Sequence, residues 1–259
     1  MTLRLVTSAY LLYLAAPIAL LLVGSFGASW SNTLLPTGFT TDWYVQLATD
    51  PSFVRAFETS LVVVAATCLV NALVGVPLAY AIHGAARSGV RFAARLVSLM
   101  PIAVPELVLA FGFILVFSSD ALPFLGATWL LVMGHVVLTL PYLLNVLLAD
   151  MAALGLDEME RAAATLGAGF RARFFDIVLP GLRHSLLAGL ITVAAISIGE
   201  FQLSNLVAGF LNRPYPVVLL QAFYGATGFA CAATVVLLAL AMLAAVAGAL
   251  TARAARAGA

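Results

Sequence analysis

The sequence has 259 residues, of which 64% are hydrophobic and only 9% are charged, and its mean hydropathy is +1.12. A soluble domain of this length cannot bury so much apolar surface, so the composition excludes an ordinary globular protein and indicates an all-α integral membrane protein. The formal net charge of +1 gives no reason to expect a nucleic acid as a partner.

All 12 basic residues are arginine, because the sequence contains no lysine. The GxxxxGK[ST] loop that binds nucleotide phosphates requires a lysine, so this chain is not expected to be an ATPase of that kind. Metal sites find no support either, since the three histidines form no HExxH pair and the two cysteines lie far apart in apolar runs. The sequence also lacks a GxSxG nucleophile motif, so an intramembrane enzyme is not expected.

Apolar stretches long enough to cross a bilayer as helices follow one another along the chain. We predict six transmembrane helices, at about residues 5–26, 59–82, 96–117, 127–148, 186–208 and 229–250. The first stretch could be a signal peptide, but its apolar part is longer than such segments need and only Arg4 precedes it. We therefore expect an uncleaved first span.

The distribution of arginine predicts the orientation of these spans. With both chain ends in the cytoplasm, 10 of the 12 arginines lie inside, including Arg253 and Arg256, and only Arg55 and Arg213 lie outside. The corresponding division is a first helix and periplasmic segment in 1–56, a main transmembrane domain in 57–252 and a cytoplasmic tail in 253–259.

Residues 150–185 form the longest polar interruption of the chain. Asp157 and Glu160 have the spacing of a capping box and predict the start of a short helix, which Gly167 would end. A second helical run is expected from about residue 171 to 178 and should stop against Pro180 and the glycine after it. The pattern predicts two short helices in a cytoplasmic loop.

This loop resembles the EAA motif of permease subunits of bacterial ATP-binding-cassette (ABC) importers. That motif reads E-A-A, three residues, G, nine residues, I, one residue, L-P, and the matching residues are Ala162, Ala163, Gly167, Ile177, Leu179 and Pro180. The glutamate position of the motif holds Arg161, and the nearest acid is Glu160, one residue earlier. Because a helix turns about 100° per residue, Glu160 should face in a different direction.

The resemblance implies a type I ABC importer permease fold, with the loop 150–185 as a coupling helix that docks on an ATPase. The residues it places at this contact are Asp157, Glu160, Arg161, Ala162, Ala163, Gly167, Ile177, Leu179 and Pro180. It implies two cytoplasmic ATP-binding subunits, a second and different permease chain, and a periplasmic solute-binding protein. The chain would lie in the bacterial inner membrane and bind no cofactor itself, because ATP would be used by the partner subunit.

Two glutamates, Glu106 and Glu200, interrupt apolar stretches, where an ionisable side chain costs about 2.5–3.5 kcal/mol or more. Glu200 could line a translocation pathway together with Gln202 and Asn205, or it could bond to a neighbouring helix. Glu106 is equally consistent with a pathway role and with helix packing. We expect His135, within the fourth span, to be a satisfied interhelical donor.

Two acids facing a pathway favour a cationic solute. The local sequence around these acids resembles the polyamine-type branch of the family. That branch also includes permeases for iron(III), thiamine, phosphonates and other small organic solutes. The alternative function is an ion-coupled secondary transporter that uses Glu106 and Glu200 as its ion sites.

Overall fold

The computed structural model describes the backbone of residues 2–31, 33–85 and 87–257, together with the side chains of these ranges from Arg4 to Leu243 and that of Val246. Within these ranges the chain is helical, apart from loops and two isolated β-bridges. Arg253, Arg256 and the predicted tail 253–259 lie outside the described side chains.

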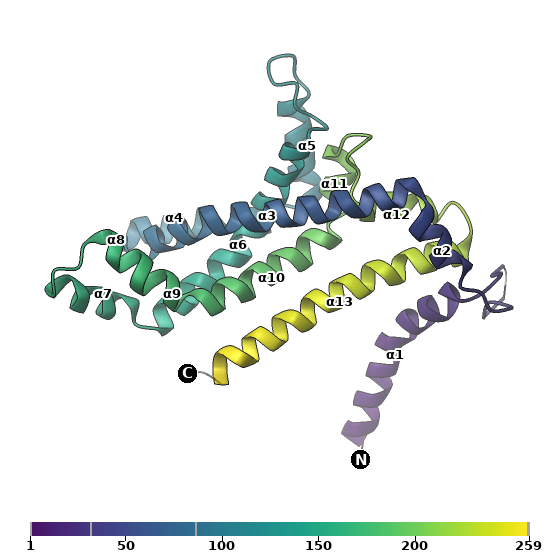
Figure 1. Ribbon diagram of the computed structural model, residues 1–259, viewed down its shortest axis with the longest axis horizontal. Helices are drawn as coiled ribbons and strands as arrows, with labels where there is room; N and C mark the ends of the chain where they lie inside the picture. The colour runs from purple at the N-terminus through teal and green to yellow at the C-terminus, as the bar shows by residue number, and fades with distance from the viewer. Residues whose placement is uncertain (1, 32, 86, 258–259) are drawn as a thin grey trace. The chain divides into compact units, whose positions relative to one another are not determined.

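The helices group into two compact units (Figure 1). The first comprises the chain up to Ser60 and Arg213–Ala241, and the second comprises Leu61–Asn212 and the chain from Met242. This grouping by contact differs from the division into 1–56, 57–252 and 253–259, which refers to the sides of the membrane and stays a prediction.

The first unit contains α1 (Thr2–Ser25), α2 (Asp42–Thr49), the start of α3 (Pro51–His83), α12 (Tyr215–Ala222) and the first part of α13 (Thr227–Ala257), as far as Ala241. α3 begins well before the predicted residue 59, because the carboxylate of Asp50 accepts hydrogen bonds from the backbone amides of Ser52 and Phe53 at 2.8 and 3.1 Å. The rings of Phe53 and Tyr215 meet edge to face at 5.6 Å inside a buried cluster.

The second unit is built around α6 (Thr128–Ala153), the most buried of the three long apolar helices that the structure describes. α10 (Arg183–Gly199) and α4 (Ser88–Ala103) pack against it. One apolar cluster lies where α6 leads into α7 (Leu156–Thr165), and another lies where α5 (Glu106–Phe117) meets α11 (Gln202–Val207). Figure 1 shows α11 beside α5.

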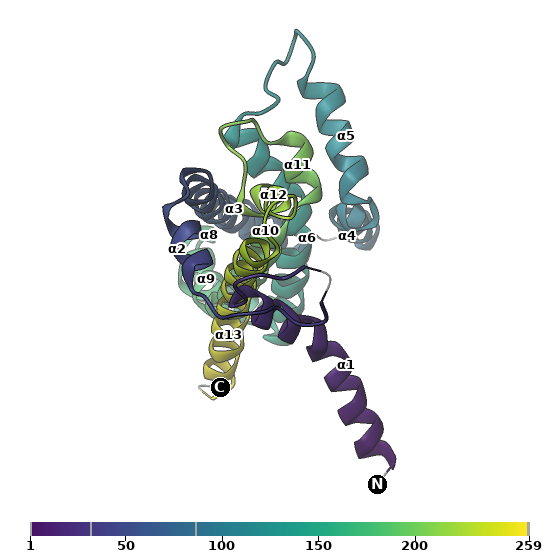
Figure 2. The same cartoon turned by 90° about the vertical axis from the view of Figure 1, so that its right-hand side faces the viewer.

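The third predicted span, 96–117, is wrong as a continuous helix. The chain forms α4 and α5, whose axes meet at 96° (Figure 2). The break falls at Val104 and Pro105, because a residue before proline is forced out of the helical region, and Val104 is extended with φ −88° and ψ 125°. α4 also begins at Ser88, so most of the basic stretch 83–95 is helix and not loop.

The fifth predicted span, 186–208, is also interrupted. α10 ends at Gly199, Glu200 has an extended backbone with φ −70° and ψ 121°, and the short α11 comes next. At the other end, α10 is bent by 62° from the helical run 170–181.

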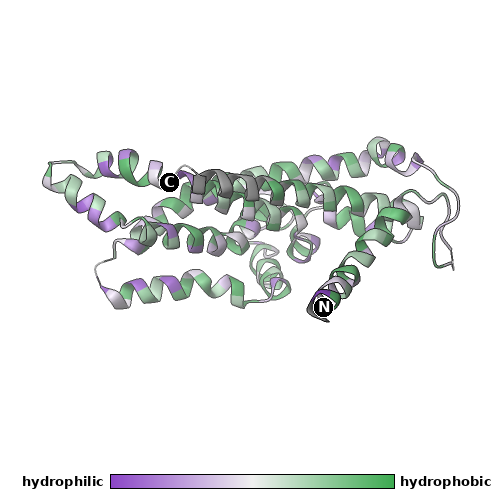
Figure 3. Cartoon of the chain, turned by 90° about the horizontal axis from the view of Figure 1, so that it is seen from below, coloured by the Kyte–Doolittle hydropathy of each residue, from purple (hydrophilic) through white to green (hydrophobic). Residues whose placement is uncertain are grey.

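The number of membrane spans is not settled by helix length. Three described helices are long and apolar enough to cross a membrane, and the count rises to five if each of two bent pairs is one span. The apolar part of α13 with described side chains, Thr227–Leu243, is shorter. Figure 3 shows how far apolar residues dominate these helices. Six spans therefore remain a prediction.

Two loops of the second unit meet at a pair of glycines. Gly126 has a left-handed backbone with φ +87°, and its amide donates a hydrogen bond to the carbonyl of Val207 at 3.2 Å. A Cβ atom on Gly209 would lie 2.5 Å from the carbonyl oxygen of Gly126. The loop that precedes α6 and the loop after α11 are thus in direct backbone contact, which only glycine permits here.

Candidate functional site

The loop 150–185 contains α7, but the start of this helix differs from the prediction. The residue before it is Gly155, with a left-handed φ of +61°, and no side chain caps the helix. The predicted capping box of Asp157 and Glu160 is therefore wrong. The carboxylate of Asp157 lies 3.1 Å from Nε2 of His83 at the end of α3, without hydrogen-bond geometry.

The end of α7 is as predicted, at Gly167. This glycine has φ +84°, its amide donates to the carbonyl of Ala164, and the amide of Ala168 donates to the carbonyl of Ala163 at 3.0 Å. These two bonds form a Schellman turn, which satisfies the last carbonyls of the helix. Ala162 lies on the exposed side of α7 and Ala163 is half-buried, so the end of the helix has a fixed shape.

Glu160 and Arg161 face in different directions. Glu160 is mostly buried, accepts a hydrogen bond of 2.6 Å from the hydroxyl of Tyr80 on α3, and lies 3.8 Å from Nη1 of Arg173. Arg161 is exposed, and its Nε donates to the carbonyl of Asp157 at 3.0 Å. The acid of this segment therefore ties α7 to its neighbours, while the arginine at the motif's glutamate position faces outward.

The second helical run of the loop extends further than predicted, from Phe170 to Gly181. It consists of α8 (Phe170–Ala172), a π-helical stretch, η1 (Arg173–Val178), and α9 (Leu179–Gly181). The run ends at Gly181, directly after Pro180, so it stops at the proline–glycine pair that the sequence indicates. Ile177 and Leu179 pack against the buried cluster of α3, α6 and α7.

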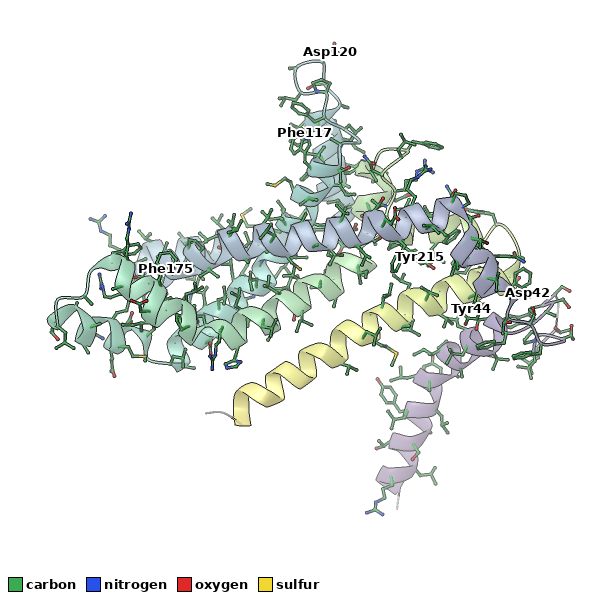
Figure 4. All side chains as sticks on the ribbon, in the orientation of Figure 1. Asp42, Tyr44, Phe117, Asp120, Phe175 and Tyr215 are labelled. Atoms are coloured by element: carbon green, nitrogen blue, oxygen red, sulfur yellow. The ribbon has the colours of Figure 1, made fainter. Side chains whose placement is uncertain are left out.

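The outward side of the loop is unusually apolar for a polar segment. Leu166 is 89% exposed, and Met159, Phe170 and Phe175 are each at least half exposed (Figure 4 labels Phe175). The inward side is anchored by Leu156, which is 1% exposed, and by the Tyr80 ring, which meets Phe174 edge to face at 5.4 Å. The inward side of the segment is therefore fixed by packing, and its outward side presents an apolar surface.

The contact between Tyr80 and Glu160 yields a modest prediction. Tyr80→Phe removes one hydrogen bond to a carboxylate and leaves the ring packing intact, so we expect a loss of about 1–2 kcal/mol of unfolding free energy. Thermal unfolding in detergent would measure it. Tyr142→Phe, at a half-exposed tyrosine of α6 without a hydrogen bond among the described residues, is the control. Equal stability of both variants would show that this bond contributes nothing.

Glu200 is buried, and both of its carboxylate oxygens accept hydrogen bonds. It is 5% exposed, and its carboxylate accepts hydrogen bonds from the amides of Leu203 and Ser204 at 2.7 and 2.9 Å and from the Ser204 hydroxyl at 2.6 Å. The side chain therefore caps the first turn of α11. Of the two roles considered from the sequence, these contacts match the bond to a neighbouring helix.

His135 of α6 meets the prediction of a satisfied interhelical donor. It is 1% exposed, with Nδ1 2.7 Å from the hydroxyl of Ser197 and Nε2 2.9 Å from that of Ser204. Nε2 also lies 3.6 Å from the carboxylate of Glu200. One buried cluster thus connects α6, α10 and α11 across the break after Gly199.

The side chains of the other predicted pathway residues make no hydrogen bond with this cluster among the described residues. Glu106 is half-buried in the first turn of α5, and Gln202 and Asn205 are exposed on α11, which packs against α5. Their role in a pathway stays a prediction. Among the described residues, no group of three or more His, Cys, Asp or Glu side chains could hold a metal ion.

Sequence reasoning missed Tyr80 and Ser197 as contact residues. Ser197 had a readable signal, since a small hydroxyl residue lies three positions before an acid in an apolar run. Tyr80 had none, because its contact with Glu160 joins residues 80 positions apart.

No protein-family model matches the chain. A permease protein assigned to 2-aminoethylphosphonate transport in Salmonella typhimurium is 26% identical over 238 residues, which are 90% of this chain and 87% of that protein. The molybdate/tungstate transport system permease protein of Thermococcus kodakarensis is 27% identical and covers 83% of this chain and 84% of its own length. The spermidine/putrescine transport system permease protein of Escherichia coli is 26% identical, over 76% of this chain and 73% of its own length.

Solved structures agree in fold. A bacterial ABC transporter involved in the import of the acidic polysaccharide alginate has a chain that superposes with a TM-score of 0.77 at 17% identity, covering 98% of this chain and 94% of that one. The alginate transporter in complex with its pentasaccharide-bound periplasmic protein gives a TM-score of 0.74 at 16% identity, covering 95% and 91%. In sequence and in fold, the chain is therefore similar to permease subunits of ABC importers.

Proposed function

We propose that the chain forms half of a translocation pathway for a small solute and couples it, through α7, to an ATPase on a separate subunit. The observation that carries this proposal is the two-sided construction of the loop 150–185. Its inner side is bonded to α3 and α6, while Leu166, Phe170 and Phe175 are presented outward. A protein partner would cover that apolar surface.

The contacts of α7 suit the transmission of rigid-body motion. Leu156 packs in the same buried cluster as residues of α3 and α6, and Glu160 and Asp157 contact Tyr80 and His83 on α3. A displacement of α7 would therefore move the ends of α3 and α6 with it, as packed elements shift together. In this mechanism ATP binding closes the ATPase pair, the spans open outward, and hydrolysis returns them inward.

The proposed assembly contains two ATP-binding subunits, a second permease chain and a solute-binding protein in the periplasm. The solved alginate transporter with a periplasmic protein supports the last of these. The chain would lie in the inner membrane with six spans and both ends in the cytoplasm, and ATP would be used only by the partner subunits. The absence of lysine, and hence of a P-loop, agrees with a separate ATPase.

We propose a small, charged solute, and the relatives do not favour one solute over another. Their names cover an aminoethylphosphonate, molybdate or tungstate, and polyamines at nearly equal identity. Two intramembrane acids favour a polyamine-like cation. This support is weaker with one of them, because Glu200 already accepts three hydrogen bonds. These hydrogen bonds also weaken the alternative of an ion-coupled secondary transporter, because that function needs Glu200 as a free ion site.

A charge placed on the outward side of α7 tests the docking. In Leu166→Asp, a carboxylate replaces an apolar side chain that the proposed partner would bury, so the ATPase subunit should no longer copurify in mild detergent. Because Leu166 is 89% exposed, thermal stability of the chain should hardly change.

Leu211→Asp is the matched control, because Leu211 is 63% exposed and lies in the loop after α11. That variant should retain the ATPase. Normal copurification of Leu166→Asp, or equal loss in both variants, would contradict docking through α7.

A further inference from the structure

A cavity of about 390 Å³ lies within the second unit, between α4 and α6. Its volume is in the range that small-molecule sites occupy. It is lined by Arg95, Ser98 and Leu99 of α4 and by Pro141, Leu144, Asn145, Leu148, Ala149 and Ala152 of α6. No acidic side chain is among these residues, so the one charge that borders the cavity is positive.

Two of the lining side chains have hydrogen-bond donors to offer. Neither Arg95 nor Asn145 makes a hydrogen bond or ion pair within the described part of the chain. Ser98 does not add a donor, because its hydroxyl already donates to the carbonyl of Ala94 at 2.7 Å. The free groups are thus a guanidinium, which binds phosphate-like and carboxylate groups with paired N–H donors, and a neutral amide.

The remaining wall is apolar and shaped by a proline. Pro141 lies inside α6 and, with Leu144 and Leu148, forms the side opposite Arg95. Apolar side chains beside a guanidinium lower the local dielectric and so strengthen its attraction for an anion, although Arg95 and Asn145 are themselves exposed in the chain taken alone. A cation would meet the opposite situation, because it would be repelled by Arg95 and would find no carboxylate in the lining.

The charged groups of α4 do not compensate for this polarity, and Asp150, the acid of α6 next to Ala149, is not among the lining residues. α4 carries no acid along its whole length, and its other arginine, Arg91, donates to the carbonyl of Ala85 at 2.8 Å. Glu200, the buried acid, is occupied by its cap of α11. The cavity is also bordered by Ala149 and Ala152, in the last turns of α6 before α7, so its position is next to the proposed coupling helix.

We propose that this cavity binds the anionic group of the translocated solute, a phosphonate-like or other compact oxyanion, with Arg95 and Asn145 as its donors. The proposal rests on the proposed function and gives its solute a negative charge. Because the cavity lies at the α7 end of α6, the anion would be held on the side where the ATPase docks.

Direct binding to the purified full chain, with the subunits that copurify, tests this assignment. Radiolabelled inorganic phosphate and methylphosphonate are the probes, and putrescine is the cationic competitor. We expect saturable binding of an anion that Arg95→Gln weakens about tenfold or more and that putrescine does not displace. Arg87→Gln is the matched control, because it removes the same charge at the start of α4, outside the cavity, and should bind within about twofold of the wild type.

Nanodiscs separate a solute from a lipid headgroup of the same chemistry. Binding should be equal in phosphatidylcholine and phosphatidylglycerol discs; loss only in phosphatidylglycerol would assign the cavity to lipid and overturn the proposal. Absence of anion binding, displacement by putrescine, or equal losses in Arg95→Gln and Arg87→Gln would overturn it as well. If the ATPase subunit still copurifies and drives uptake, the proposed function survives such a failure, whereas a wild-type chain that retains no ATPase contradicts that function itself.

Discussion

Replacing Glu200 with alanine is expected to destabilise the protein by about 3 kcal/mol or more, the largest effect of any single substitution we foresee. The variant leaves the amides of Leu203 and Ser204 without their acceptor at the start of α11 and leaves His135 beside an empty space. Because the site is 5% exposed, water cannot readily take the place of the carboxylate.

Thermal unfolding in detergent measures this effect, and two variants calibrate it. Glu200→Gln retains an acceptor oxygen and should lose clearly less stability than the alanine variant. Glu106→Ala removes a half-buried acid from α5 and should cost less than about 1 kcal/mol. If Glu200→Ala unfolds like the wild type while uptake collapses, the carboxylate acts in the pathway and its capping role is incidental.

Gly209→Ala is expected to cost about 2–3 kcal/mol through crowding alone. Its methyl group would lie 2.5 Å from the carbonyl oxygen of Gly126 and 3.2 Å from the carbonyl carbon of that residue. Both are backbone atoms, so no side-chain rotation can relieve the clash. One of the two loops would have to move, at the expense of the bond from Gly126 to the carbonyl of Val207.

The matched control for this substitution is Gly112→Ala within α5. A Cβ there meets no atom within 4 Å, and alanine favours a helix over glycine, so this variant should be as stable as the wild type or more stable by up to about 1 kcal/mol. Thermal unfolding compares the two. A Gly209→Ala protein no less stable than Gly112→Ala would mean that the two loops separate without cost.

The sequence predicted the helical class, the approximate position of most apolar helices and the turn at Gly167, because hydropathy and helix-ending glycine are local signals. It also predicted His135 as an interhelical donor, since a polar side chain in an apolar helix needs a partner. Pro105 indicates the break after Ala103, whereas the break after Gly199 was not predicted.

The second break had no local signal strong enough to outweigh the apolar run around it. Glu200 draws attention as an acid at depth, and a pathway role and a structural bond are both consistent with the sequence. Only tertiary contacts show that its oxygens turn back on α11. The capping box at Asp157 failed for a related reason, because His83, distant in sequence, holds that carboxylate.

The π-helical stretch η1 makes the length of the loop as important as its composition. A π-turn holds about one residue more than an α-turn, and this extra residue lets Arg173 approach Glu160 while Val178 remains in the buried cluster. Deleting a single residue from 173–178 would restore α-helical geometry and leave the residues on either side nearly in phase, because the π-helical stretch uses one extra residue to complete the same rotation. We therefore expect this stretch to tolerate the loss of one residue better than the gain of another, which would rotate the residues on one side by about 100° relative to those on the other.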